Sequence, residues 1–131
     1  MFVDASAIVA ILVREDDADE LAARLGAARR RLTSAIAVYE VVTALARLRQ
    51  GPVERARIIV GDFLDRNAIA HVNIGPAEEI VALDAFDRYG KGRHPARLNM
   101  GDCFAYACAK TNGVPLLFKG ADFAQTDIAV A

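Results

Sequence analysis

Residues 1–12 of the chain read MFVDASAIVAIL: a short apolar run, an acid, and then a longer apolar run. The run Met1–Val3 is typical of a buried strand, because it is short, apolar and closed by a carboxylate. We expect the hydroxyl of Ser6 to cap a helix that continues to Leu12. A strand followed at once by a helix begins an α/β unit, and it leaves Asp4 at the carboxyl end of the strand.

The same alternation of strand and helix continues through the rest of the chain. Gly51-Pro52 ends one predicted helix, and Gly75-Pro76 closes one predicted strand. We expect helices over residues 17–28, 34–50, 53–66, 77–89 and 103–112, and strands over residues 31–33, 71–74, 114–118 and 128–130. Short apolar strands between helices favour a mostly parallel sheet covered by helices on both faces. No repeat or linker interrupts the pattern, so residues 1–131 are expected to form one domain.

Two of the predicted helices carry an apolar face that should point inward. Ser34 can cap the helix at 34–50, whose face consists of Val38, Val41, Val42, Leu45 and Leu48. In the helix at 77–89, the inward residues are expected to be Ile80, Leu83 and Phe86.

The composition is that of an ordinary globular protein, with 54% apolar and 25% charged residues. The net charge of −1 gives no electrostatic reason to expect a nucleic-acid partner, so such a function has to rest on a local site. Cys103 and Cys108 lie five residues apart in a predicted helix, which favours reduced, buried thiols over a disulfide or a zinc site. No stretch is suited to cross a membrane or to direct export, so we expect a soluble, cytoplasmic protein.

Three acids are expected to meet at one edge of the sheet. Sites in parallel sheets form beyond the carboxyl ends of the strands. Asp4 follows the first strand, Asp122 follows the strand at 114–118, and Asp102 begins the helix that leads into that strand. Two carboxylates at about 4 Å repel each other by about 4 kcal/mol, so such a cluster holds either protons or a cation. Oxygen ligands without nearby Cys or His select Mg²⁺ or Mn²⁺.

Each of these residues also has a purely structural interpretation. Asp4 could be a helix cap or a turn residue, although Ser6 is sufficient to cap that helix, and we favour a functional role for Asp4. Asp102 after a glycine could be a helix N-cap, and Ser6 could be a cap without a catalytic role. On a helical wheel Glu40 lies opposite Val38 and Leu45, so its default place is the solvated face. Asp122 could cap a short turn, with Asp127 beginning the last strand. We prefer Asp122 to Asp127 for the site, because Gly120 allows a tight turn back over the strand and Phe123 can anchor it.

The clusters of basic residues are mostly expected to be exposed to solvent. Arg29–Arg31 is expected to be a solvated cluster. The loop from Lys91 to Arg97 could hold RNA phosphates or a protein partner, although an exposed loop without function is the simpler interpretation.

Three motifs, taken in order, resemble the PIN domain, and more narrowly the VapC-type toxins of bacterial toxin–antitoxin operons. They are the start at Val3–Ala7, the stretch LNMGDCFAYA at residues 98–107, and the stretch LLFKGADF at residues 116–123, with Glu40 between them. The resemblance covers essentially the whole chain. It implies a PIN-like three-layer α/β/α sandwich with a short, mostly parallel sheet.

The resemblance also implies a function and its residues. It implies a magnesium-dependent endoribonuclease, with Mn²⁺ as a substitute ion, that cleaves cellular RNA and is neutralised by a cognate VapB-like antitoxin. Asp4, Glu40, Asp102 and Asp122 correspond to the acidic quartet and metal ligands, and Ser6 to a serine or threonine that hydrogen-bonds within the site. The family commonly forms homodimers, for which the apolar helix at 34–50 would be suited.

Other functions remain open at this point. A PIN-like module that binds RNA or a protein without catalysis would keep the fold, although the presence of all four acids argues against it. A receiver-like phosphoacceptor domain also gathers acids and a late lysine such as Lys119. It would need adjacent acids after the first strand, where Ala5 and Ser6 stand instead. An aspartyl phosphatase would need a second aspartate at position 6.

Overall fold

The computed structural model describes all residues 1–131 and contains one four-stranded parallel sheet. In the order β3-β2-β1-β4, its strands are Ile69–Val72, Arg31–Ser34, Phe2–Val3 and Leu116–Leu117. Phe2 lies opposite Leu32 on one side and Leu116 on the other, so β1 occupies the middle of the sheet. A further parallel bridge joins Leu116 to Val130, which confirms an edge segment near the end of the chain.

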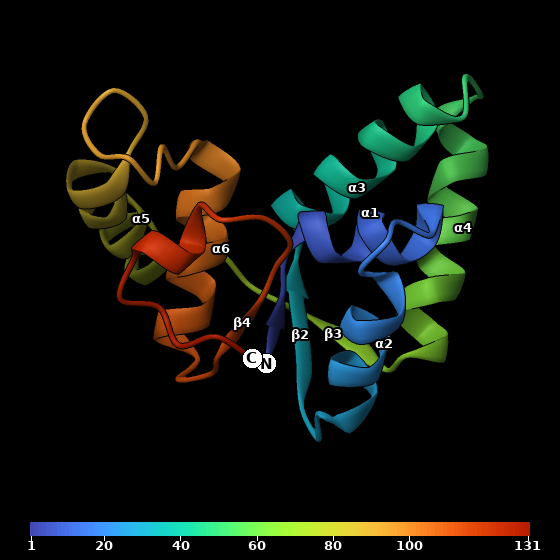
Figure 1. The fold of residues 1–131 in the computed structure, drawn as a ribbon, viewed down its shortest axis with the longest axis horizontal. Coiled ribbons are helices and arrows are strands. Elements are labelled where there is room, and N and C mark those ends of the chain that lie inside the picture. The colour runs from blue at the N-terminus through green and yellow to red at the C-terminus, as the bar shows by residue number, and fades with distance from the viewer.

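Helices cover both faces of this sheet, as predicted (Figure 1). On one side lie α1, α2, α3 and α4, which span Ala5–Val13, Ala18–Ala27, Ala35–Leu48 and Val53–Arg66. On the other side lie α5 at Pro76–Tyr89 and α6 at Met100–Thr111, followed after β4 by a short 3-10 helix, η1, at Phe123–Gln125. No helix is both long and apolar enough to traverse a lipid bilayer.

Each helical layer has its own apolar core, and the sheet separates the two. Consecutive residues of a strand point to opposite faces. Phe2 and Leu116 therefore belong to the core beneath α5 and α6, while Val3 and Leu117 belong to the core beneath α1–α4. All four side chains are fully buried. The three-layer α/β/α arrangement expected from the sequence is confirmed.

Two strands differ from their predicted bounds by more than one residue. The third strand was expected at 71–74 but spans Ile69–Val72, because the chain turns at Ala68, which has a φ of 49°, and enters the sheet directly afterwards. The strand predicted over 114–118 is reduced to Leu116–Leu117, since Pro115 has no N–H to donate to a neighbouring strand.

The predicted inward face of the helix at 77–89 is wrong. In α5, Ile80 and Leu83 are each 61% exposed and Phe86 is 41% exposed, whereas Ala82, Ala85 and Tyr89 are buried. Small alanine side chains allow α5 to pack closely against α6, and that packing turns the larger apolar residues outward. The apolar face of α3 is partly confirmed: Val41, Val42 and Leu45 are buried, but Val38 is only half-buried and Leu48 is exposed.

Candidate active site

Asp4 lies where β1 ends and α1 begins, and only 4% of its surface is exposed. Its Oδ2 accepts hydrogen bonds from the Ser6 backbone N–H, at 2.9 Å, and from the Ser6 hydroxyl. The prediction that Ser6 caps this helix is wrong, because helical backbone begins at Ala5 and Asp4 takes the capping position. Burial raises the pKa of Asp4, and the hydrogen bonds from Ser6 partly oppose that rise.

Ser6 connects two segments that are distant in the chain. Its hydroxyl donates to Asp4 and accepts a hydrogen bond from the backbone N–H of Lys119, at 3.0 Å. Lys119 lies two residues beyond β4. Ser6 therefore fixes both the orientation of the Asp4 carboxylate and the path of the chain as it leaves β4.

Asp102 lies in the first turn of α6 and forms a capping box with Asn99. The Asp102 N–H donates to Asn99 Oδ1 at 3.0 Å, and Asp102 Oδ2 accepts from the Asn99 N–H at 2.8 Å. The interpretation of Asp102 as the N-cap is thus wrong, since Asn99 holds that position. Burial raises the pKa of Asp102 to about 6 against the effect of the Asn99 hydrogen bond, and the charges of Asp4 and Asp122 add to the rise.

Glu40 extends from α3 toward the first turn of α6, so its default assignment to the solvated face is wrong. A Cβ atom added at Gly101 would overlap the Glu40 carboxylate. Glycine at this position therefore gives the carboxylate the room to lie beside Asp102. Burial raises the pKa of Glu40 to about 7, with further contributions from the negative charges of Asp4 and Asp102.

The side chains of Asp4, Ser6, Glu40 and Asp102 line one open hollow of about 380 Å³. It lies at the carboxyl end of β1, where parallel sheets place their sites. The hollow also contains Glu15 and Lys119, and Lys119 forms ion pairs with Glu15 and with Asp17, the latter at 3.1 Å. The positive charge of Lys119 is therefore already paired with acids.

Sequence reasoning missed this ion pair and the role of Gly101. For the ion pair, the available signal was a lysine directly after the strand predicted at residues 114–118, together with the acidic stretch from Glu15 to Asp17 that follows the first helix. For Gly101 no signal exists in the sequence, because the need for glycine depends on how α3 and α6 meet.

The two late acids differ in their surroundings. Asp122 is exposed at the start of η1, makes no capping hydrogen bond, and follows Gly120, which has a φ of 99°. Its negative charge contributes to the raised pKa of Asp102, but Asp122 is not among the residues that line the hollow. Phe123 is buried with its ring 5.1 Å from that of Phe118, and it anchors the turn as expected.

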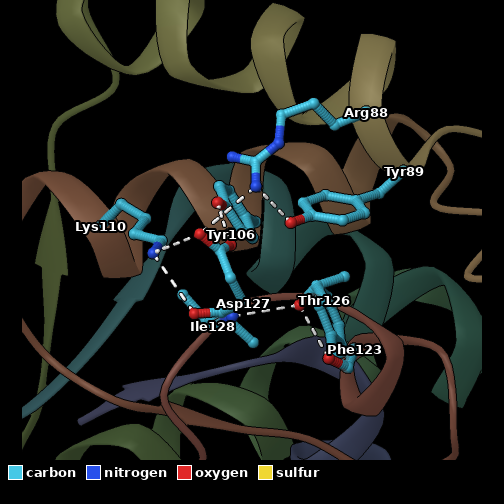
Figure 2. Close-up of polar contacts among 8 residues, drawn as sticks. All are labelled: Arg88, Tyr89, Tyr106, Lys110, Phe123, Thr126, Asp127 and Ile128. Carbon is cyan, nitrogen blue, oxygen red and sulfur yellow. Dashed lines mark hydrogen bonds and ion pairs between the residues drawn. The ribbon is translucent and has the colours of Figure 1, made fainter.

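Asp127 instead takes part in a separate polar cluster, shown in Figure 2. It accepts a hydrogen bond from the Tyr106 hydroxyl at 2.6 Å and forms ion pairs with Lys110, at 3.3 Å, and Arg88, at 3.5 Å. The Tyr106 hydrogen bond, followed by the contacts with Lys110 and Arg88, lowers the pKa of Asp127 to about 2. This carboxylate joins the C-terminal segment to α5 and α6.

The atoms of the hollow that could act as metal ligands suit a hard divalent cation. All are carboxylate or hydroxyl oxygens, and Cys103 and Cys108 are buried free thiols on α6. As they are placed, no three aspartate, glutamate, histidine or cysteine side chains form a group that could hold a metal ion. Burial is the main cause of the raised pKa values of Glu40 and Asp102, and the mutual repulsion of the acids, which a cation would relieve, adds to it. The suitability of the hollow for a divalent cation therefore rests on the oxygen ligands that it offers and on the space that Gly101 leaves for Glu40.

Comparison with known proteins identifies close relatives along the whole chain. The family model of the PIN domain matches residues 1–129. A VapC ribonuclease of Rhizobium meliloti is 45% identical over 139 residues, which cover 97% of this chain and 98% of the relative. Ribonuclease VapC30 of Mycobacterium tuberculosis is 41% identical over 129 residues, which cover 98% and 96%.

A solved structure has the same fold. The crystal structure of Mycobacterium tuberculosis VapC20, described as a Sarcin-Ricin loop cleaving toxin, superposes with a TM-score of 0.76 and covers 99% of this chain and 97% of its own. The sequence identity is 17%, so this likeness concerns the fold alone.

Proposed function

This chain belongs to the PIN domain family, and from that premise we propose that it is a VapC-type toxin, an endoribonuclease that cleaves cellular RNA and is neutralised by a cognate antitoxin. One observation carries the catalytic part of the proposal: Asp4, Glu40 and Asp102 line a single hollow at the carboxyl end of the strands. The relatives named as VapC ribonucleases share this chain over nearly its whole length.

The proposal includes a divalent cation, Mg²⁺ with Mn²⁺ as a substitute, held by Asp4, Glu40, Asp102 and Asp122. When bound, the ion supplies positive charge that favours deprotonation of an attacking water and stabilises charge on the phosphoryl oxygens. Ser6 holds Asp4 in one orientation through its two hydrogen bonds to that carboxylate. Asn99 does the same for Oδ2 of Asp102.

In the hollow without a cation the pKa of Glu40 is raised to about 7, and a bound cation would lower it by relieving the repulsion from Asp4 and Asp102, so that Glu40 is available as a carboxylate. Its carboxylate lies in the same hollow as the other acids, so a proton leaving a water molecule there has a nearby acceptor. Water as the nucleophile predicts products with a 5′-phosphate.

The test is cleavage of a labelled single-stranded RNA with Mg²⁺, with Mn²⁺ and with EDTA, followed by analysis of the product ends. We expect cleavage only with a divalent ion, and 5′-phosphate ends. Full activity in EDTA, or 2′,3′-cyclic phosphate products, would contradict the mechanism. A protein that binds RNA but cuts none under any of these conditions would be the catalytically silent module instead. Labelling by acetyl phosphate would identify the receiver-like alternative.

We also propose that the protein forms a homodimer and binds a VapB-like antitoxin that covers the acidic hollow. The face of α3 first considered for the dimer is already packed within the core beneath α1–α4. The exposed apolar side chains of the molecule include Ile80, Leu83 and Phe86 on α5 and Met100 at the start of α6. A contiguous apolar surface of this kind favours a self-complementary interface with a second copy.

A further inference from the structure

The segment between α5 and α6 is strongly basic in a chain whose net charge is −1. From Gly90 to Asn99 it contains Lys91, Arg93 and Arg97 and no acid. Together with His94, these side chains line an open hollow of about 480 Å³, whose other lining residues are Gly92 and Pro95 and which contains no large apolar side chain. The basic loop, residues 90–99, is therefore a concave surface of cations and backbone.

The basic loop is held rigidly by its own hydrogen bonds and by two buried anchors. The Lys91 N–H donates to the Leu98 carbonyl, and the Leu98 N–H donates to the Tyr89 carbonyl, both at 3.0 Å. Ala96 and Leu98 are fully buried. His94 accepts a hydrogen bond from the Ala96 N–H through Nδ1 and packs against the Tyr89 ring. A ligand that binds here meets a surface that is already ordered.

Two of the three cations have no partner within the protein. Arg93 forms an ion pair with Asp87 at 2.8 Å and packs over the Phe86 ring. Lys91 and Arg97 are exposed, and neither side chain forms an ion pair or a hydrogen bond with the protein. Arg97 also has a φ of 52°, a conformation that costs a non-glycine residue some stability.

The basic loop lies at the same end of the molecule as the acidic hollow. In Figure 1 it occupies the upper left, where α6 begins, and the strands run toward that end. Arg97 precedes Asp102 by five residues, which limits the separation of their Cα atoms to about 17 Å. Single-stranded nucleic acids commonly occupy sites of about 4–16 nucleotides, so one strand can reach both.

We propose that Lys91 and Arg97 bind backbone phosphates of the RNA strand whose scissile bond lies in the acidic hollow. This inference rests on the proposed function. The charged side chains of the hollow are mostly acidic, and Lys119 within it is already paired with Glu15 and Asp17, so any attraction that protein side chains exert on the RNA backbone has to come from cations outside the hollow. The absence of large apolar side chains from the lining of the basic loop favours phosphates over a protein partner, since protein interfaces are anchored by buried aromatic and aliphatic side chains.

The first test measures how RNA binding depends on salt. A 16-nucleotide single-stranded RNA of mixed sequence is titrated with Asp4→Asn protein at several salt concentrations. The slope of log K against log salt changes by about 0.7 for each phosphate of a single strand that the protein no longer neutralises. Adding Lys91→Gln and Arg97→Gln should therefore flatten the slope by about 1.4. The matched control is Arg29→Gln with Arg30→Gln, two exposed arginines before β2 at the opposite end of the strands, and it should leave the slope unchanged.

The second test measures cleavage in the active protein. The Lys91→Gln, Arg97→Gln variant should raise KM for the 16-nucleotide RNA at least tenfold while kcat stays within twofold. A dinucleotide has a single phosphate, the one in the scissile bond, and so leaves none for the basic loop; it should be cleaved with unchanged kcat/KM. An unchanged salt slope and an unchanged KM would overturn the inference. So would a variant that binds and cleaves RNA normally but no longer binds an antitoxin, since the basic loop would then be a partner surface. Failure of the unmodified protein to cut any RNA contradicts the proposed function instead, and the salt slope still decides this inference.

Discussion

At the scale of single residues, the acidic hollow combines structural and electrostatic roles in the same side chains. Asp4 caps α1 while its charge raises the pKa of Glu40, and Asp102 completes the capping box of α6 while it does the same. An acid in such a position can be replaced by its amide with little structural cost, because asparagine serves as a cap about as well as aspartate. Charge and capping can therefore be separated by mutation.

We predict that Asp4→Asn and Asp102→Asn each remove most of the RNA cleavage but leave the fold intact. The amide oxygen still accepts the N–H of Ser6 or Asn99, and the loss of one negative charge relieves repulsion in the hollow. Thermal unfolding without divalent ions should show an unchanged or slightly raised Tm. If either variant cuts RNA at a near-normal rate, that residue serves only to stabilise the start of its helix.

A second residue-scale prediction concerns pH. The pKa of Glu40 is about 7 in the folded protein against an ordinary value of 4.5. Between these values the folded state holds a proton that the unfolded state releases, so the free energy of unfolding falls as pH rises from about 4.5 to about 7. Glu40→Gln should reduce this slope in urea titrations made with EDTA. Glu20→Gln, at an exposed acid on α2, should not; equal slopes in all three proteins would contradict the raised pKa.

At the scale of elements, the site depends on how closely α3 approaches the first turn of α6. That approach is permitted by Gly101, which has no side chain to displace Glu40. We predict that Gly101→Ala lowers the rate of RNA cleavage at least tenfold, because the added methyl group moves the Glu40 carboxylate. Stability should change by no more than about 1 kcal/mol, since alanine is the better helix former.

Gly61 on α4 supplies the matched control for Gly101. A Cβ added there meets no atom within 4 Å. Gly61→Ala should therefore raise the free energy of unfolding by up to about 1 kcal/mol and leave cleavage unchanged. Unchanged cleavage in both glycine variants would show that the position of Glu40 is not limiting.

The C-terminal segment carries the other element-scale prediction. Asp122→Asn should lower kcat or the affinity for the metal at least tenfold, whereas Asp127→Asn should leave cleavage nearly unchanged. Asp127→Asn should instead lower stability by about 1 kcal/mol, a modest value because the ion pairs with Lys110 and Arg88 are half-exposed to water. This contribution is present above about pH 4 and is lost as pH falls toward 2. The measurements are single-turnover cleavage and metal titration. A larger loss in Asp127→Asn than in Asp122→Asn would identify Asp127 as the fourth carboxylate of the site.

These elements also show what a sequence can and cannot specify. Helix α4 was predicted at its observed bounds, because a proline before it and a run of helix formers mark it locally. The outward turn of Leu83 and Phe86 could not be predicted, since it follows from the packing of α5 against α6. The direction of Glu40 is the same kind of feature: periodicity assigned it to solvent, and only the resemblance to the PIN domain brought it into the site.

At the scale of the whole molecule, the exposed apolar surface on α5 predicts a dimer. Leu83→Asp should convert the protein to a monomer at micromolar concentration. Because Leu83 is 61% exposed, the stability of the monomer itself should change little, and any fall in Tm should come from the loss of association. Sedimentation velocity measures the result. Ile58→Asp, at a residue of α4 that is 58% exposed, is the control and should leave the dimer intact. An unmodified protein that is strictly monomeric would contradict the dimer.

The position of β1 between β2 and β4 has a consequence for the order in which the protein is made. Asp4 is synthesised more than a hundred residues before Lys119, whose backbone N–H donates the hydrogen bond that secures Ser6. Asp102 and Asp122 also come from the last third of the sequence. During synthesis the hollow therefore cannot be complete until the residues up to Lys119 have emerged and folded against β1. RNA cleavage at this site would have to wait for that step.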